Sequence, residues 1–163
     1  MTSIAYREGI LACDSAWGDT ARVDTLASKI CRLRSGALLG QAGTYDWRLF
    51  IELLNDVKTF RGLPKYNALA DIRADALMLL ILPNRTIVKV ATVFTSPGNW
   101  TEDSDTGIGA WEITEDFSAV GSGAPLAIGA MEAGASARQA VRIACRRDLN
   151  SRLPVHTLQF PKK

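Results

Sequence analysis

Histidine is almost absent from this chain of 163 residues, and cysteine is scarce. A single histidine, His156, excludes a His-rich metal site, and no CxxC pair points to bound zinc. Cys13, Cys31 and Cys145 are odd in number and lie in apolar segments, which is typical of reduced, buried thiols in a cytoplasmic protein. We therefore expect no metal, no cofactor and no disulfide framework.

Long apolar runs and an excess of one charge are also missing. The chain has no stretch of about 18 apolar residues and no charged opening followed by an apolar segment, so we expect neither a membrane span nor a signal peptide. The net charge of +2 is too small to indicate a nucleic-acid or membrane partner. With 47% hydrophobic residues, the length predicts one globular domain, residues 1–163, with a sizeable core.

Apolar periodicity divides the chain into strands and helices. Strands are expected over residues 2–8, 9–13, 26–34, 37–42, 75–82, 85–92, 111–113, 117–121 and 155–160. Helices are expected over residues 44–59, 124–133 and 136–149. Ser136 and Gln139 form a capping box for the last helix, Glu8 and Gly9 a tight turn, and residues 95–109 a polar loop. Strands and helices come in separate runs, which predicts an α+β fold with helices packed on antiparallel sheets.

The second residue, Thr2, is the most informative about function. Methionine aminopeptidases remove Met1 when a small residue follows, and removal leaves an α-amine and a β-hydroxyl on Thr2. An α-amine has a reference pKa of about 7.7–8.0, so it can accept a proton near neutral pH. A hydroxyl nucleophile needs a nearby base, and a threonine paired with its own amino terminus is one known solution.

Six short motifs follow one another along the chain at compatible spacing. They are Thr2, Asp14 after the second strand, Lys29 on the third strand, Gly40-Gln41-Ala42-Gly43-Thr44-Tyr45-Asp46, Gly121-Ser122-Gly123 and Arg147-Asp148-Leu149-Asn150-Ser151. In this order they resemble the proteasome β-subunit family of N-terminal nucleophile (Ntn) hydrolases, which are threonine peptidases. The chain is also similar to the bacterial peptidase that partners an ATP-dependent unfoldase. The resemblance covers about residues 2–60 and 75–160.

The resemblance implies a role for each matched residue. Thr2 is expected to attack a peptide carbonyl after Met1 is removed and to pass its proton to its own amine. Lys29, held by Asp14, is expected to lower the pKa of the hydroxyl, and the backbone N–H of Gly43 to bind the oxyanion. The hydrogen-bonding groups around the amine are expected to come from Ser122, Asp148 and Ser151.

The resemblance also implies a binding pocket, an architecture and partners. The pocket for the substrate side chain is expected to involve Gln41, Cys31, Trp17, Ala27 and Tyr45. The implied architecture is a four-layer αββα sandwich of two antiparallel sheets with helices outside. One helical layer is reduced, because residues 63–74 are too few for the family's second long helix. The implied substrates are peptides or unfolded proteins. The implied partners are further copies of the chain in a homo-oligomeric ring and an ATP-dependent unfoldase.

Other interpretations of the same residues stay open. Taken singly, Asp14 is a common turn residue, Lys29 a common solvated strand residue and Gly43 a common turn glycine. A non-catalytic scaffold or assembly protein of the same fold, or an amide hydrolase acting on small molecules, fits the pattern as well. Cys13 is not expected to be a nucleophile, because no histidine lies near it in the sequence, and His156 is interpreted as structural.

Overall fold

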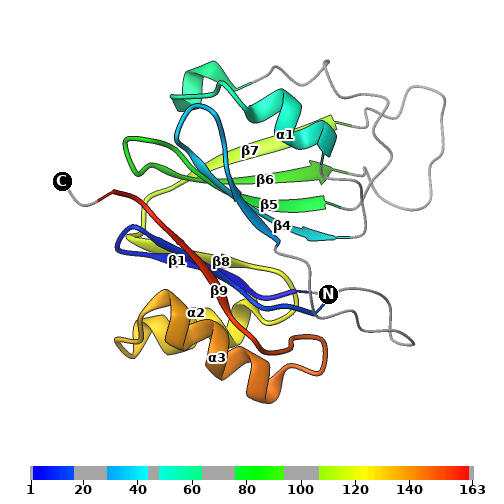
Figure 1. Cartoon of the computed structure of the whole chain (residues 1–163), viewed down its shortest axis with the longest axis vertical. Helices are drawn as coiled ribbons and strands as arrows, with labels where there is room; N and C mark the ends of the chain where they lie inside the picture. The colour runs from blue at the N-terminus through cyan, green and yellow to red at the C-terminus, as the bar shows by residue number, and fades with distance from the viewer. Residues whose placement is uncertain (1, 17–28, 44–47, 64–75, 94–106, 162–163) are drawn as a thin grey trace, which may run out of the picture.

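Two antiparallel β-sheets lie one above the other in this protein (Figure 1). The computed structural model describes residues 2–16, 29–43, 48–63, 76–93 and 107–161. Helices cover the outer faces of the two sheets, so the predicted α+β fold with antiparallel sheets is confirmed. Within these ranges, no helix combines the length and the apolar character needed to cross a bilayer.

The first sheet is built from both ends of the chain. Its strands, in spatial order, are β8 (Phe117–Val120), β1 (Ile4–Arg7), β2 (Ile10–Cys13) and β9 (His156–Gln159). The two residues between β1 and β2 are the predicted tight turn, with φ of 51° at Glu8 and 82° at Gly9. Positive φ at both central residues matches the right-handed twist of the flanking strands, which fixes their register.

The second sheet takes the middle of the chain. Its strands, in spatial order, are β3 (Ile30–Arg32), β4 (Leu38–Gly43), β5 (Ala76–Ile81), β6 (Ile87–Val93) and β7 (Gly107–Ile113). Strand β7 begins four residues before the predicted start at Trp111, because it pairs with β6 from Val93↔Gly107 to Ile87↔Ile113. The predicted loop over residues 95–109 is therefore wrong at its end, and residues 94–106 lie outside the described part.

The helices occupy both outer faces. They are α1 (Arg48–Leu54), the 3-10 turn η1 (Phe60–Gly62), α2 (Ala124–Glu132) and α3 (Ala137–Arg147). Ser136 and Gln139 form the predicted capping box at the start of α3. The helix predicted to reach Thr59 ends at Leu54. The Asn55 side chain instead accepts a hydrogen bond from Arg34 N at 2.7 Å, and the Asn55 carbonyl accepts one from the N–H of Ser35.

Three apolar clusters hold these layers together. One lies under α1 against the second sheet, one between the sheets, and one between the first sheet and the pair α2 and α3. Strand β5 contributes Met78 and Leu80 to the first cluster and Leu79 and Ile81 to the second. A strand that is buried on both faces reads as a continuous apolar run, as β5 does.

Candidate active site

The segment Thr2–Ser3, which leads into β1, is buried against the start of α2. Thr2 is 3% exposed and Ser3 is fully buried. Gly121 has φ of +95°, and a Cβ at this position would lie 2.0 Å from the carbonyl oxygen of Thr2. At Gly123 an added Cβ would lie 1.8 Å from Ser3 Oγ. The Gly121-Ser122-Gly123 motif therefore does more than begin a helix, because only glycine allows this close approach.

Asp14 collects four hydrogen bonds from separate parts of the chain. Its fully buried carboxylate accepts from Ser3 N and from Lys29 Nζ, both at 2.8 Å, on Oδ1. Its Oδ2 accepts from Ala16 N at 2.9 Å and from Arg152 N at 3.1 Å. A buried carboxylate is costly unless its lone pairs are satisfied, and here both oxygens are. Asp14 therefore fixes the start of β1, the start of β3 and the segment after α3.

Lys29 is a buried cation rather than a solvated strand residue. It lies directly before β3, is 3% exposed and forms its ion pair with Asp14. The N–H of Gln41 donates to the carbonyl of Lys29 at 3.0 Å, which ties β4 to this position. Asp14 follows a strand of one sheet and Lys29 precedes a strand of the other, so the pair crosses between the sheets.

A second group of polar residues is connected to the Thr2 nitrogen through Ser122. Thr2 N donates to Ser122 Oγ at 3.3 Å, and Ser122 Oγ donates to Asp148 Oδ2 at 2.8 Å. Ser151 Oγ donates to the same oxygen at 2.5 Å. Asp148 is placed by the end of α3, where its N–H donates to Ala144 O at 2.7 Å. The structure thus brings together the three residues expected near the α-amine, with Ser122 open to solvent and Ser151 fully buried.

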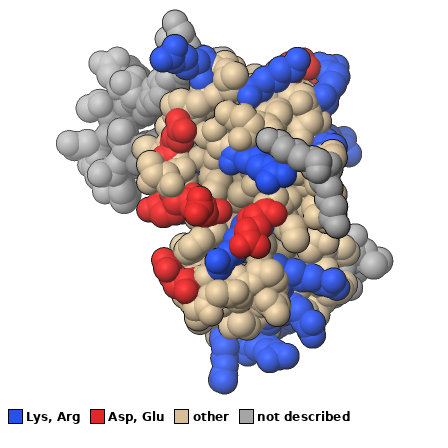
Figure 2. Space-filling view, turned by 90° about the vertical axis from the view of Figure 1, so that its left-hand side faces the viewer, with Lys and Arg blue, Asp and Glu red and all other residues tan. Residues whose placement is uncertain are grey.

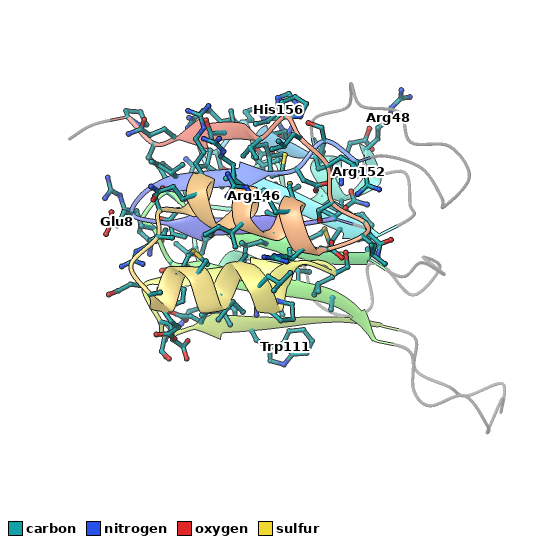
Figure 3. All side chains as sticks on the ribbon, turned by 90° about the horizontal axis from the view of Figure 1, so that it is seen from below. Glu8, Arg48, Trp111, Arg146, Arg152 and His156 are labelled. Carbon is teal, nitrogen blue, oxygen red and sulfur yellow. The ribbon has the colours of Figure 1, made fainter. Side chains whose placement is uncertain are left out.

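The site lies at one end of the stacked sheets. Viewed from the helical side, Arg152 lies beyond the end of α3, at the opposite end of the molecule from Glu8 (Figure 3). Thr2 and Asp14 lie at the ends of β1 and β2 that are remote from the Glu8–Gly9 turn. The face at the turn end carries acidic and basic side chains together (Figure 2).

The expected oxyanion donor and pocket residues are only partly described. Gly43 is exposed at the end of β4 and has φ of 128°. Gln41 is 7% exposed and lies across from Lys29, whereas Cys31 is half-buried and packs on the cluster under α1. The other expected pocket residues lie outside the described residues: Trp17, Ala27 and Tyr45.

Sequence reasoning missed Ser3, whose N–H donates to Asp14 and whose hydroxyl lies 2.6 Å from Ser151 Oγ. In an extended segment, successive side chains point to opposite sides, so a site built around the Thr2 side chain gives no local reason to include Ser3. A signal was available in the sequence, because a small polar residue follows the proposed nucleophile directly before an apolar strand.

The cysteines correct two expectations. Cys13 lies directly opposite His156 in the β2–β9 register, so the tertiary structure supplies the histidine neighbour that sequence distance had hidden. Burial nevertheless raises the pKa of the Cys13 thiol to about 11, which keeps it protonated and unreactive at neutral pH. Burial likewise raises the pKa of Cys31 and of Cys145 to about 11, although both are only half-buried, not buried as predicted. Across the described residues, no three His, Cys, Asp or Glu side chains gather to hold a metal ion.

The fold and this site define an α+β protein of two stacked antiparallel sheets with a buried Lys–Asp pair between them. The chain matches no family model, and no curated protein matches it. Solved structures share its fold, among them two of Thiobacillus denitrificans BPH. One is Thiobacillus denitrificans BPH, with 19% identity, a TM-score of 0.61 and 99% of each chain covered. The other is Thiobacillus denitrificans BPH in complex with epoxomicin, with 22% identity, a TM-score of 0.57 and 99% of each chain covered.

Proposed function

We propose that this chain is a proteasome-like Ntn hydrolase, a threonine-type peptidase with Thr2 as its nucleophile after removal of Met1. In this proposal its layers are the αββα sandwich of that family, with α2 and α3 on one side and a reduced helical layer, represented by α1, on the other. The fold shared with Thiobacillus denitrificans BPH, which binds epoxomicin, supports the proposal.

One observation carries the proposal: Asp14 Oδ1 accepts at 2.8 Å from both Lys29 Nζ and Ser3 N. This shared oxygen brings a buried ammonium group to the residue that follows Thr2. Burying a lysine and an aspartate costs several kcal/mol for each ion before their attraction offsets it. A strongly desolvated ion pair beside a hydroxyl and an amino terminus is typical of a site that activates a nucleophile.

The proposed reaction has two halves. The Thr2 hydroxyl attacks the peptide carbonyl, its proton moves to the Thr2 amine, and the Lys29 ammonium stabilises the developing negative charge. The Gly43 N–H would bind the oxyanion, a contact worth about 3–4 kcal/mol of transition-state stabilisation. The amine fragment takes the proton as it leaves, and Thr2 keeps the acyl group as an ester. Water then attacks the ester, releases the acid and restores the hydroxyl.

The groups around the Thr2 nitrogen suit this proton transfer. Ser122 gives its only hydroxyl proton to Asp148, at 2.8 Å, so its lone pairs face the Thr2 nitrogen as acceptors. A free amine in this place donates one N–H to Ser122 Oγ, and its single lone pair is left to receive the proton of the Thr2 hydroxyl. Asp148 and Ser151 fix Ser122 in turn.

The proposed substrates are peptides or unfolded proteins, acted on in the cytoplasm within a self-compartmentalised homo-oligomeric ring. An ATP-dependent unfoldase would then deliver folded substrates. Gln41 is proposed to lie at the pocket for the side chain before the cut, because it is paired with Lys29 across β3 and β4.

Epoxomicin tests the proposal directly. It is a peptide epoxyketone, and its ketone and epoxide can react with the hydroxyl and the free amine of one N-terminal residue without losing any atom. Intact mass spectrometry should show a chain that lacks Met1 and gains the full mass of one inhibitor. Thr2→Ser should still react, whereas Thr2→Ala should not.

Other outcomes separate the remaining interpretations. A chain that retains Met1 and forms no adduct contradicts the peptidase and favours the scaffold. An adduct on a monomer that cleaves small amides but no peptide favours the amide hydrolase. Native mass spectrometry decides whether a closed ring forms.

A further inference from the structure

Ser3 forms hydrogen bonds with both groups of polar residues in the candidate site. Its N–H donates to Asp14 Oδ1 at 2.8 Å, and its carbonyl accepts from Asp14 N at 3.0 Å. Its hydroxyl lies 2.6 Å from Ser151 Oγ. Ser3 therefore contacts the residue that holds Lys29 and also the residue that holds Asp148, although the two sets of contacts come from opposite ends of the chain.

Counting protons gives a direction to the hydrogen bond between the two serines. A serine has one hydroxyl proton, and Ser151 gives its proton to Asp148 Oδ2 at 2.5 Å, since a carboxylate can only accept. Ser3 must then be the donor to Ser151. The resulting chain runs from Ser3 through Ser151 to Asp148, where it meets the chain from Thr2 through Ser122.

Close packing leaves Ser3 little freedom to move. The residue is fully buried, and its Oγ fills the space where residue 123 would carry a Cβ if it were not glycine. Ser151 is also fully buried. Because Ser3 directly follows Thr2, a shift of Ser3 of a few tenths of an ångström moves the hydroxyl and nitrogen of Thr2 as well.

We propose that Ser3 is a positioning residue that ties the Lys29–Asp14 pair to the hydrogen-bonded groups around the Thr2 nitrogen. This inference rests on the proposed function of Thr2. Ser3 does not touch the substrate, because it has no exposed surface. It acts through its neighbours, by holding the cation on one side of Thr2 and the acceptors on the other side in a fixed relation.

The experiment compares Ser3→Ala with Ser118→Ala in the full chain. Ser118 is also a buried serine of the first sheet, 4% exposed on β8, but it lies across from Tyr6 and outside the site. The rate of epoxomicin labelling is measured against inhibitor concentration by intact mass, and thermal unfolding of each variant is recorded. We expect Ser3→Ala to lower the maximal labelling rate about tenfold, the effect of one lost buried hydrogen bond. The inhibitor concentration that gives half of that rate should not change, and Ser118→Ala should label like the unaltered chain.

A second comparison separates positioning from a general loss of stability. In the double variant Ser3→Ala with Ser151→Ala, labelling should be no slower than in the slower single variant, because both changes break the same chain of hydrogen bonds. The positioning role would be overturned if the rate loss in the double variant equalled the product of the two single losses. It would also be overturned if Ser3→Ala labelled at the rate of the unaltered chain. Either result would leave the proposed function intact. If the unaltered chain is not labelled at all, the proposed function and this inference both fail.

Discussion

Lys29 Nζ lies 2.8 Å from Asp14 Oδ1, and the two side chains are 2% and 0% exposed. Asp14 ends the β1–β2 hairpin of the first sheet, and Lys29 begins the β3–β4 hairpin of the second. The pair therefore links two sheets that also share an apolar cluster and a hydrogen bond from Arg32 to the carbonyl of Gln159. Its removal should affect the stacking of the sheets as well as any chemistry at Thr2.

Replacing the lysine tests this link. Lys29→Met keeps the length of the side chain but leaves Asp14 as a buried carboxylate without its cation. Such a change costs about 3–5 kcal/mol of unfolding free energy. The control is Arg34→Met at the exposed ion pair with Asp56, whose side chains are 69% and 71% exposed. Solvent screens that pair, so Arg34→Met should lower the unfolding free energy far less than Lys29→Met. Urea denaturation measures both losses. Equal losses in the two variants would contradict a special role for the buried pair.

Substituting the glycine beside Thr2 should destabilise the protein more than substituting a glycine with open space around its Cβ position. Gly121 and Gly134 have nearly the same φ, +95° and +92°, but an added Cβ meets Thr2 O at 2.0 Å in the first and nothing within 4 Å in the second. Gly134→Ala should cost about 1 kcal/mol from the positive φ alone. Gly121→Ala should cost about 1–3 kcal/mol more, because the backbone of Thr2 must move. Chemical denaturation measures both values, and similar losses would show that Thr2 is not packed as described.

The charge of Asp148 should set the pH dependence of the proposed reaction. A nearby carboxylate favours the protonated form of an amine, so Asp148→Asn should lower the pKa of the Thr2 amine. The free base would then persist to lower pH, and the midpoint of the rate–pH profile should move to lower pH. The maximal labelling rate should fall, because the hydrogen bonds from Ser122 and Ser151 lose their charged acceptor.

An exposed carboxylate gives the matched control for that change. Asp116→Asn removes the same charge in the turn between β7 and β8, at the far end of the sheets. Its labelling profile should match that of the unaltered chain. A shift of equal size in both variants would mean that net charge, and not the position of Asp148, sets the profile.

The buried thiol of Cys13 should make the protein less stable in alkali. Burial raises its pKa from 9.0 to about 11 in the folded chain. Between these values the unfolded chain releases the proton and the folded chain retains it, so stability falls as pH rises. The loss is on the order of 2 kcal/mol at pH 11. Urea denaturation across this range should show a shallower decline for Cys13→Ala, and an unchanged slope would contradict burial of the thiol.

Local signals in the sequence predicted most of the elements. The alternation and turn residues around Glu8 and Gly9 placed the first hairpin, and Ser136 with Gln139 placed the start of α3. These signals work because turns, caps and apolar faces depend on residues only a few positions apart. Strand β7 was predicted too short because Gly107 and Gly109 lower strand propensity locally, whereas pairing with β6 decides its length.

Contacts between segments that are distant in the sequence could not be predicted from these local signals. Local patterns predicted four strands over residues 2–42, but only the fold assigns β1 and β2 to one sheet and β3 and β4 to the other. The histidine opposite Cys13 comes from β9, and the partner of the Ser3 hydroxyl from the segment after α3. Which residues face each other across sheets depends on stacking, and stacking has no local pattern in the sequence.

The sequence by itself determined the order of the elements and the polar residues that interrupt them: a threonine, an aspartate, a lysine and two serine-containing turns. Only the tertiary structure decided that these groups meet at one end of two stacked sheets, with a lysine and an aspartate removed from water. The physical reason is that a buried charge is tolerable only where several donors or acceptors converge on it, and the four donors around Asp14 come from segments that folding alone brings together.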